Sequence, residues 1–163
     1  MNVLRIKLVS LVFMLISSAA MADDPNDKKK EKSDEIGNLI ESKSYVFVAR
    51  SVTPLSGATK HLSSGYDLTL AGDTLVAFLP YFGRAYMMVR PGADGGIKFT
   101  STKYEYKLKT IKRGWEISLK TKDVENSPEL FLSISKSGYA ELRVSDISRE
   151  SISFYGHIEA RKD

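Results

Sequence analysis

The sequence has 163 residues, no cysteine and a formal net charge of +4. A chain of this length builds one domain with a sizeable core, and without cysteine it holds no disulfide, no thiolate metal site and no thiol for a lipid anchor. The small net charge is weak evidence for a nucleic-acid partner or an anionic membrane partner.

The first 22 residues have the three parts of a secretory signal peptide. Arg5 and Lys7 precede an uncharged run over residues 8–20, and small residues lead up to Ala22. A membrane-spanning helix needs about 20 apolar residues, so a cleaved signal fits better than the alternative, a retained membrane helix. Cleavage after Ala22 leaves 141 residues, and the loss of two cations lowers the formal net charge to +2. We therefore expect a periplasmic or secreted protein without a membrane span.

Residues 23–34, DDPNDKKKEKSD, are charged and almost without apolar side chains. Such a segment buries too little surface to offset its ordering entropy, so we interpret it as a flexible charged leader. Ile36, Leu39 and Ile40 follow at helical spacing, which predicts a short helix of two or three turns against one end of a sheet. A single folded domain is expected over residues 35–163.

From Tyr45 to Ile158 the apolar residues alternate with polar ones. This period predicts about nine or ten short antiparallel strands joined by hairpin turns, that is, an all-β domain with one N-terminal helix. Residues 74–79, TLVAFL, are apolar on both faces and are expected to be covered on both sides. A strongly curved, partly closed barrel satisfies the pattern without a long exposed edge, and a two-sheet sandwich is the alternative.

Three segments carry a family resemblance: LPYFGRAY at 79–86, GIKF at 96–99 and FYGHI at 154–158. With these segments the chain resembles the exported bacterial family called domain of unknown function 4251, from about Ile36 to Ile158. The resemblance implies a lipocalin-like β-barrel behind a signal peptide, and it implies neither an activity nor a catalytic residue. Without a lipobox cysteine, this chain would fall among the members that are not lipidated.

The LPYFGRAY segment supplies the candidate binding site. Pro80 lacks an amide hydrogen and Gly83 has backbone angles closed to other residues, so we expect a bend that re-aims the aromatic rings. Rings and a guanidinium at the mouth of a cavity pack an apolar ligand and meet an anionic head group. The candidate ligand-binding residues are Tyr81, Phe82, Arg84 and Tyr86. The alternative is that the rings fill the core and the arginine caps carbonyls or pairs with a carboxylate.

Residues 98–113 are locally basic, and Tyr104 and Tyr106 are interleaved with the lysines. Because lysines and tyrosines alternate, they lie on opposite faces of a strand and do not act together on one base. We interpret the segment as a solvated outer face and expect no nucleic-acid partner. Contact with anionic envelope polymers is the alternative.

No motif indicates catalysis or metal binding. His61 and His157 have no ligand neighbours at metal-binding spacing, and the serines lack a GxSxG-like elbow. A pair of glycosidase carboxylates would have to come from acids such as Asp67, Asp73, Glu105 or Glu116, which the sequence does not place across a cleft. We therefore expect no catalytic residue, no metal and no cofactor.

Together these patterns predict a non-catalytic binding module of the cell envelope for a small apolar or amphipathic ligand. A protein-interaction or envelope-structural module without a ligand cavity is the first alternative. An enzyme acting on an envelope polymer is the second. The expected partner is accordingly a small hydrophobic ligand or an envelope protein.

Overall fold

The computed structural model describes residues 25–86 and 95–161, so the expected signal peptide over residues 1–22 lies outside the described residues. The described chain forms one helix and ten strands. In chain order they are α2 (Pro25–Ser42), β1 (Ser44–Pro54), β2 (Lys60–His61), β3 (Asp67–Ala71), β4 (Thr74–Leu79), β5 (Ile97–Ser101), β6 (Tyr104–Ile111), β7 (Gly114–Thr121), β8 (Glu129–Ser135), β9 (Tyr139–Asp146) and β10 (Arg149–Ala160).

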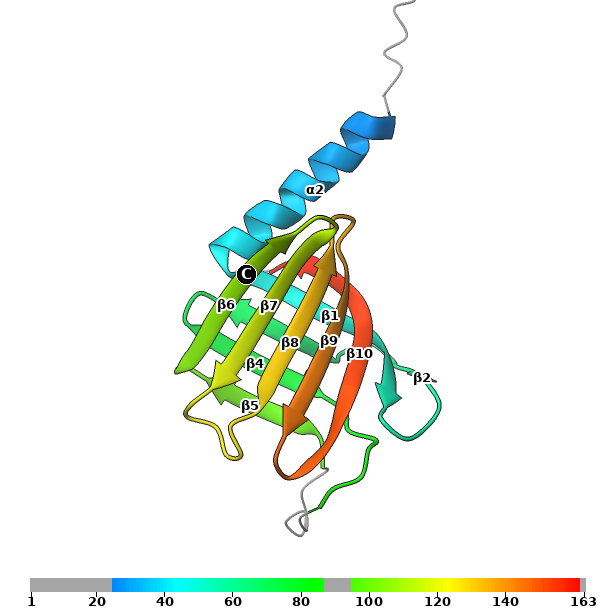
Figure 1. The fold of residues 1–163 in the computed structure, drawn as a ribbon, viewed down its shortest axis with the longest axis vertical. Coiled ribbons are helices and arrows are strands. Elements are labelled where there is room, and N and C mark those ends of the chain that lie inside the picture. The colour runs from blue at the N-terminus through cyan, green and yellow to red at the C-terminus, as the bar shows by residue number, and fades with distance from the viewer. Residues whose placement is uncertain (1–24, 87–94, 162–163) are drawn as a thin grey trace, which may run out of the picture.

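The strands form one antiparallel sheet in the order β5-β4-β3-β1-β10-β9-β8-β7-β6, and the short β2 pairs with β1. Strands β5 and β6 follow each other in the sequence but lie at the two ends of this order, so the sheet curls into a half-barrel (Figure 1). Register shifts in β1 and β10 mark bulges, which bend strands. The expected all-β, curved antiparallel fold is confirmed, and the sheet is continuous rather than split in two.

Alternation along the strands fills the concave side of the sheet with apolar side chains. In β1, Tyr45, Phe47 and Ala49 are buried while the residues between them are only partly covered. The largest fully buried side chains are Tyr45, Phe47, Phe154, Ile36, Ile40, Leu68, Leu70, Leu75, Leu79, Ile117, Leu119 and Leu130. The interior that these residues occupy is therefore a packed hydrophobic core.

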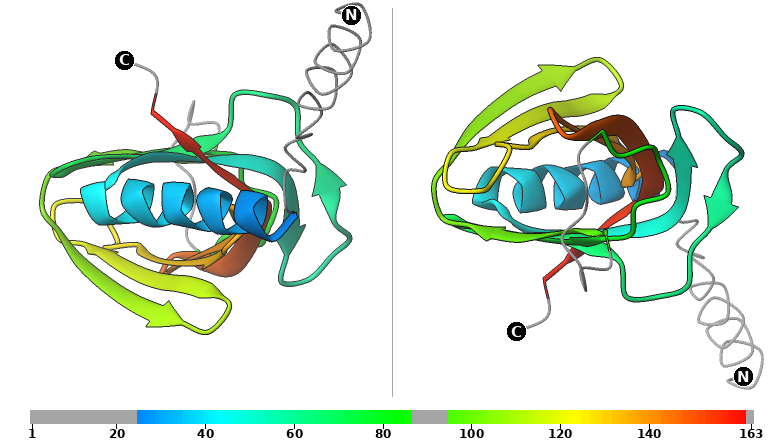
Figure 2. Two further views of the ribbon diagram at one scale, coloured as in Figure 1. Left: turned by 90° about the horizontal axis from the view of Figure 1, so that it is seen from above. Right: turned by 90° about the horizontal axis from the view of Figure 1, so that it is seen from below.

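Helix α2 lies across one end of the half-barrel (Figure 2), as its apolar spacing predicted. Ile36 and Ile40 are fully buried, and the Tyr106 hydroxyl donates to the Ile40 carbonyl at 3.4 Å. Gly37 faces the Trp115 ring so closely that a methyl group there would lie 3.3 Å from the ring. The C-terminal half of α2 is thus an integral part of the core.

The predicted length of this helix is wrong, because α2 begins at Pro25, inside the segment interpreted as a leader. Proline fits the first turn of a helix, and the lysines and glutamate that follow have high helix propensity. Lys32 also pairs with Glu35 at 3.0 Å, one turn further on. Residues 26–32 are exposed, so this half of the helix projects beyond the sheet (Figure 1).

The double covering expected for residues 74–79 is also wrong. Leu75, Ala77 and Leu79 point into the core, but Phe78 on the other face of β4 is 42% exposed. Its ring stacks on Tyr66 with a centroid distance of 5.9 Å, and the Lys98 ammonium lies 4.5 Å from its centroid. Side chains on the same outer face, rather than a second layer, cover this part of the strand.

Candidate functional site

The segment after β4 runs along the turn between β9 and β10, at the end of the half-barrel remote from α2 (Figure 1). The Tyr86 amide donates to the Ser148 carbonyl at 2.8 Å, and the Glu150 amide donates to the Arg84 carbonyl at 3.0 Å. Ala85 forms an isolated antiparallel bridge with Arg149. Backbone pairing therefore holds the candidate residues against a turn that lies more than 60 residues away in the sequence.

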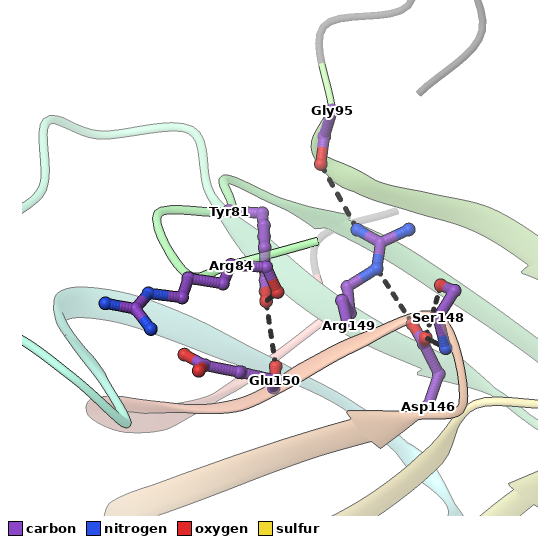
Figure 3. A network of polar contacts seen from close by, with 7 residues as sticks. All are labelled: Tyr81, Arg84, Gly95, Asp146, Ser148, Arg149 and Glu150. Carbon is purple, nitrogen blue, oxygen red and sulfur yellow. Dashed lines mark hydrogen bonds and ion pairs between the residues drawn. The ribbon is translucent and has the colours of Figure 1, made fainter. Parts of the chain in front are cut away.

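Tyr81 is the internal brace of this segment (Figure 3). Its hydroxyl lies 2.8 Å from the Arg84 carbonyl and 3.0 Å from the Glu150 carbonyl, and the Arg149 guanidinium lies 5.0 Å from its ring centroid. Burial is the main cause that raises the pKa of Tyr81, and the nearby arginine partly offsets it. A methyl group at Gly83 would meet the Tyr81 hydroxyl at 2.5 Å, so the bend requires glycine.

Arg149 ties three parts of the chain together at this end. Its Nε pairs with Asp146 Oδ2 at 2.9 Å, and its Nη1 donates to the Gly95 carbonyl at 3.2 Å. The other carboxylate oxygen of Asp146 accepts the Ser148 amide at 2.7 Å and the Ser148 hydroxyl. The turn, the Tyr81 ring and the chain before β5 therefore form one connected network (Figure 3).

The other three candidate residues face outward. Phe82 is 44% exposed, Tyr86 is 67% exposed, and Arg84 is exposed as well. Ile147, in the turn that Tyr86 pairs with, is 75% exposed. We call Phe82, Arg84, Tyr86 and Ile147 the open-end patch. The sequence predicted the first three of these residues as binding residues, but not Ile147. An apolar residue within a polar turn is a signal that could have identified it.

Charged groups flank the open-end patch. The Lys60 ammonium, from β2, lies 4.5 Å from the Phe82 ring centroid. The acidic residue near the patch is Glu150, and its Oε2 is buried without a hydrogen-bond partner among the described residues. Figure 3 shows the Arg84 side chain extending away from Arg149, on the side where the Glu150 carboxylate lies. Two cations, Lys60 and Arg84, and one partly exposed acid, Glu150, therefore flank the patch.

Three surface pockets lie elsewhere on the molecule, and none of them is lined by the four candidate residues. The first, of about 520 Å³, lies between α2 and the end of β10. It contains the Lys32–Glu35 ion pair at 3.0 Å and a side-chain contact between His157 Nε2 and Glu159 Oε1 at 2.6 Å. The titratable groups that converge there are thus already partnered with one another.

The second pocket, also of about 520 Å³, lies on the strands β8 to β10 and includes the exposed Tyr139. The third is larger, about 620 Å³, and is lined by Lys28, Lys29, Lys32, Lys112, Arg113, Ser135, Lys136 and Ser137. From the sequence, residues 23–34 were interpreted as a flexible charged leader and residues 98–113 as a solvated outer face, and Lys136 was not considered. Their convergence comes from the fold alone.

On β6, Tyr104 and Tyr106 lie on the opposite face from the lysines, as the alternation in the sequence predicted. The Tyr104 hydroxyl donates to the Gly72 carbonyl at 2.7 Å, and Tyr106 reaches the Ile40 carbonyl. Lys107 and Lys109, which alternate with them, are exposed. Tyrosines and lysines therefore do not share a face on β6.

No group of three or more histidines and acids within residues 25–86 and 95–161 is placed to hold a metal ion. His61 is exposed on β2, and the side chain of His157 contacts Glu159. In the same part of the chain, α2 is too polar to count as a bilayer-crossing helix.

Comparison with known proteins agrees with the fold. The sequence model of the family named domain of unknown function (DUF4251) matches residues 27–158. A crystal structure of a DUF4251 family protein from Bacteroides eggerthii superposes with a TM-score of 0.60 at 18% sequence identity. The superposition covers 80% of this chain and 88% of that chain, which establishes a shared fold. Among curated proteins, none matches this sequence.

Proposed function

The chain belongs to the DUF4251 family, and we propose that it acts as a non-catalytic binding module that holds an amphipathic ligand on its open-end patch. The apolar part of the ligand packs on the rings of Phe82 and Tyr86 and on Ile147. Its anionic head group meets Arg84 and Lys60. Binding takes place on the outer surface and not inside the half-barrel, whose interior is filled by side chains.

The observation that carries this proposal is the outward orientation of Phe82 and Tyr86 beside a rigid brace. Tyr81 and Arg149 fix the segment through hydrogen bonds and the ion pair with Asp146, while the neighbouring rings are left in water. Single exposed apolar side chains are common, but a group of them on adjoining loops marks an interaction site. A fixed backbone also lowers the entropy lost when a ligand orders the surface.

The charges at the patch favour an anionic head group. Arg84 is exposed, and Lys60 is held over the Phe82 ring, so both cations lie next to the apolar surface. The acid of this region, Glu150, is only partly exposed, and one of its carboxylate oxygens is buried. A cation beside an aromatic ring suits a ligand that joins an acyl chain to a carboxylate or phosphate.

Titration calorimetry with laurate tests the proposal, with dodecyl maltoside as the uncharged comparison. We expect saturable binding of laurate, weaker binding of the maltoside, and at least a tenfold loss of laurate affinity in a Phe82→Ala, Tyr86→Ala double variant. Arg84→Gln should weaken laurate binding but not maltoside binding, because it removes charge and keeps the rings.

Two control substitutions lie on the outer face of the sheet. Phe131 is 45% exposed, like Phe82, and the Arg143 side chain is 62% exposed. Phe131→Ala and Arg143→Gln should leave laurate affinity unchanged. Equal losses in the patch variants and the control variants, or no saturable binding of laurate to the unaltered protein, would contradict the proposal.

The cellular location belongs to the same proposal. The basic, apolar and small-residue parts of residues 1–22 support export and cleavage after Ala22. Intact-mass spectrometry of the protein recovered from its native host should give a chain that begins at Asp23 and is found outside the cytoplasm. A full-length chain retained in the cytoplasm would refute export.

A protein-interaction module is the second candidate, and one observation favours it. Among the described residues, the sheet ends in β5 and β6, each of which has a strand partner on one side only. Such an edge accepts an added strand from a partner protein through main-chain hydrogen bonds. Native mass spectrometry of protein purified gently from its envelope distinguishes the two candidates, because a bound lipid-sized mass and a bound subunit give different spectra.

A further inference from the structure

The largest of the three pockets lies at the opposite end of the half-barrel from the open-end patch, and its walls come from three separate elements. The exposed N-terminal half of α2 forms one wall with Lys28, Lys29 and Lys32. The turn between β6 and β7 contributes Lys112 and Arg113, and the turn between β8 and β9 contributes Lys136. We call these six cations, with Ser135 and Ser137, the basic cleft.

The charge of the basic cleft is unbalanced. No acid lines it, and its six cations exceed the formal net charge of the whole chain, which is +4. Lys32 is paired with Glu35, but Lys29, Lys112, Arg113 and Lys136 make no ion pair with an acid of the described residues. Like charges held close together repel one another, and a bound anion relieves the repulsion.

The two turns that form the floor of the cleft are fixed to each other and to the helix. The Lys136 amide donates to the Arg113 carbonyl at 3.2 Å, which joins the turns. The Ser135 hydroxyl lies 2.9 Å from the Ser137 hydroxyl and donates to the Tyr139 carbonyl at 3.0 Å. The side chain of Ile36 packs against Gly138, where an added methyl group would approach its Cδ1 to 3.0 Å. The backbone that carries Lys112, Arg113 and Lys136 is therefore fixed relative to α2.

The size and the lining indicate the class of ligand. A cavity of about 620 Å³ suits a small molecule or a head group, since small-molecule sites typically span about 300–1,000 Å³. Lysine, arginine and serine side chains are donors for phosphate oxygens. No aromatic ring lines the cleft, whereas sites for single-stranded nucleic acid stack bases on such rings.

We propose that the basic cleft is a binding site for a compact, multiply phosphorylated small molecule or lipid head group. Two or more phosphate groups bridge the helix wall and the turn floor, with Lys28, Lys29 and Lys32 on one side and Lys112, Arg113 and Lys136 on the other. This site is separate from the open-end patch, and it acts whether or not the patch binds an amphiphile.

Titration calorimetry with inorganic tripolyphosphate tests this site. We expect one saturable site in the unaltered protein, with an affinity that falls as the salt concentration rises. The double variant Lys112→Gln, Lys136→Gln should bind at least tenfold more weakly, and Lys29→Gln on the helix wall should also weaken binding. Thermal melts of all variants identify any that fail to fold, and these positions are exposed.

The matched control is Lys107→Gln, Lys109→Gln on β6, which removes the same number of charges from exposed positions outside the cleft. This control should change the tripolyphosphate affinity less than twofold, and so should the patch variant Phe82→Ala, Tyr86→Ala. Equal weakening by the two lysine pairs, or no saturation at millimolar tripolyphosphate, would overturn the proposal.

Two further ligands distinguish the sources of the phosphate groups. Vesicles of phosphatidylcholine that contain cardiolipin present a head group with two phosphates, and competition between these vesicles and tripolyphosphate would assign the cleft to a lipid. Binding of tripolyphosphate without binding of the vesicles would assign it to a free molecule. Tighter binding of oligothymidylate than of tripolyphosphate would overturn the proposal in favour of nucleic acid.

Discussion

Tyr81 and Phe82 are neighbours in the sequence and have opposite roles in the structure. Tyr81 is partly buried and its hydroxyl lies between two carbonyls, whereas Phe82 points into water beside Lys60. The sequence predicted a bend at this place from Pro80 and Gly83, and it singled out the rings. It did not predict which ring faces inward, because that depends on carbonyls of a turn near residue 150.

Removing the hydroxyl of Tyr81 tests the brace. Tyr81→Phe should lower the free energy of unfolding by about 1 kcal/mol, because the hydroxyl that bonds to the Arg84 and Glu150 carbonyls is lost. Urea denaturation measures the change. The control is Tyr139→Phe, at a side chain that is 72% exposed, for which we expect a change below about 0.5 kcal/mol. The brace would be disproved if the two variants were equally stable.

A second substitution tests the close approach of β7 to β8. Gly114 has a φ of +151°, and a methyl group there would lie within 1.9 Å of the Ile134 carbonyl oxygen. Gly114→Ala should therefore cost about 3 kcal/mol or more, or prevent folding. Gly72 has a φ of +61° with no atom near its added methyl group, so Gly72→Ala should cost only about 1 kcal/mol, from backbone strain. Thermal denaturation that ranks the two variants in reverse would contradict the register of this hairpin.

At the scale of elements, α2 combines two halves with different roles. Ile36 and Ile40 complete the core, while residues 26–32 extend past the sheet and form a wall of the basic cleft. The spacing of the isoleucines predicted the first role. The second was missed because a charged segment without apolar side chains has the composition of a disordered leader, although its lysines and its glutamate also favour helix when one end is anchored.

Changes in the two halves of α2 should affect the free energy of unfolding differently. Ile40→Ala should lower the free energy of unfolding by about 3 kcal/mol, because it leaves a cavity in a packed core. A chain shortened to begin at Ser33 should unfold within about 0.5 kcal/mol of the longer chain, since it loses exposed residues only. Guanidinium denaturation of both proteins checks this. A large loss on shortening would show that the projecting half is part of the folded core.

The corner between β5 and β6 depends on a single carboxylate. Asp123 accepts hydrogen bonds from the Ser101 hydroxyl and from the amides of Thr102 and Lys103. The serine hydroxyl first, and then the Thr102 amide, lower the pKa of Asp123 below its ordinary value. Because the folded pKa is lower than the unfolded one, this contribution to stability is complete above the unfolded value near 3.8 and is lost as pH falls through the folded value.

Asp123→Asn should therefore be less stable than the unaltered protein at about pH 7, and the difference should shrink at about pH 2.5, because below 3.8 the unfolded chain takes up a proton at this aspartate. Urea midpoints at the two pH values measure the difference, and titration of the other carboxylates cancels between the two proteins. A stability difference that is the same at both pH values would contradict the assigned role of the charge.

For the molecule as a whole, the sequence was informative about periodicity and uninformative about long-range juxtaposition. Alternation from Tyr45 to Ile158 predicted the number of strands and the inward faces, because it is a local property of each strand. The order of the strands and the basic cleft depend on pairing between distant segments, which the sequence did not predict, whereas it did predict a curved, partly closed barrel. No regular spacing in the sequence predicts a site shared by Lys29, Lys112 and Lys136.

The molecule thus carries two surfaces of different chemistry at opposite ends of one packed half-barrel. The open-end patch combines rings with cations, and the basic cleft holds cations and serines without rings. Between them the core contains the large side chains of Phe47, Phe154 and their neighbours at zero exposure. Both proposed sites therefore lie on the outer surface of the protein.

Nuclear magnetic resonance with amide and methyl labelling, during a titration with laurate, distinguishes binding on the outer surface from binding in the interior. Binding at the open-end patch should shift the amide signals of Phe82, Arg84, Tyr86 and Ile147 and leave the methyl signals of the core residues Ile117, Leu132 and Leu142 unshifted. Shifts of those core methyl signals, with the open-end amides unmoved, would place the ligand inside the half-barrel and refute binding at the patch.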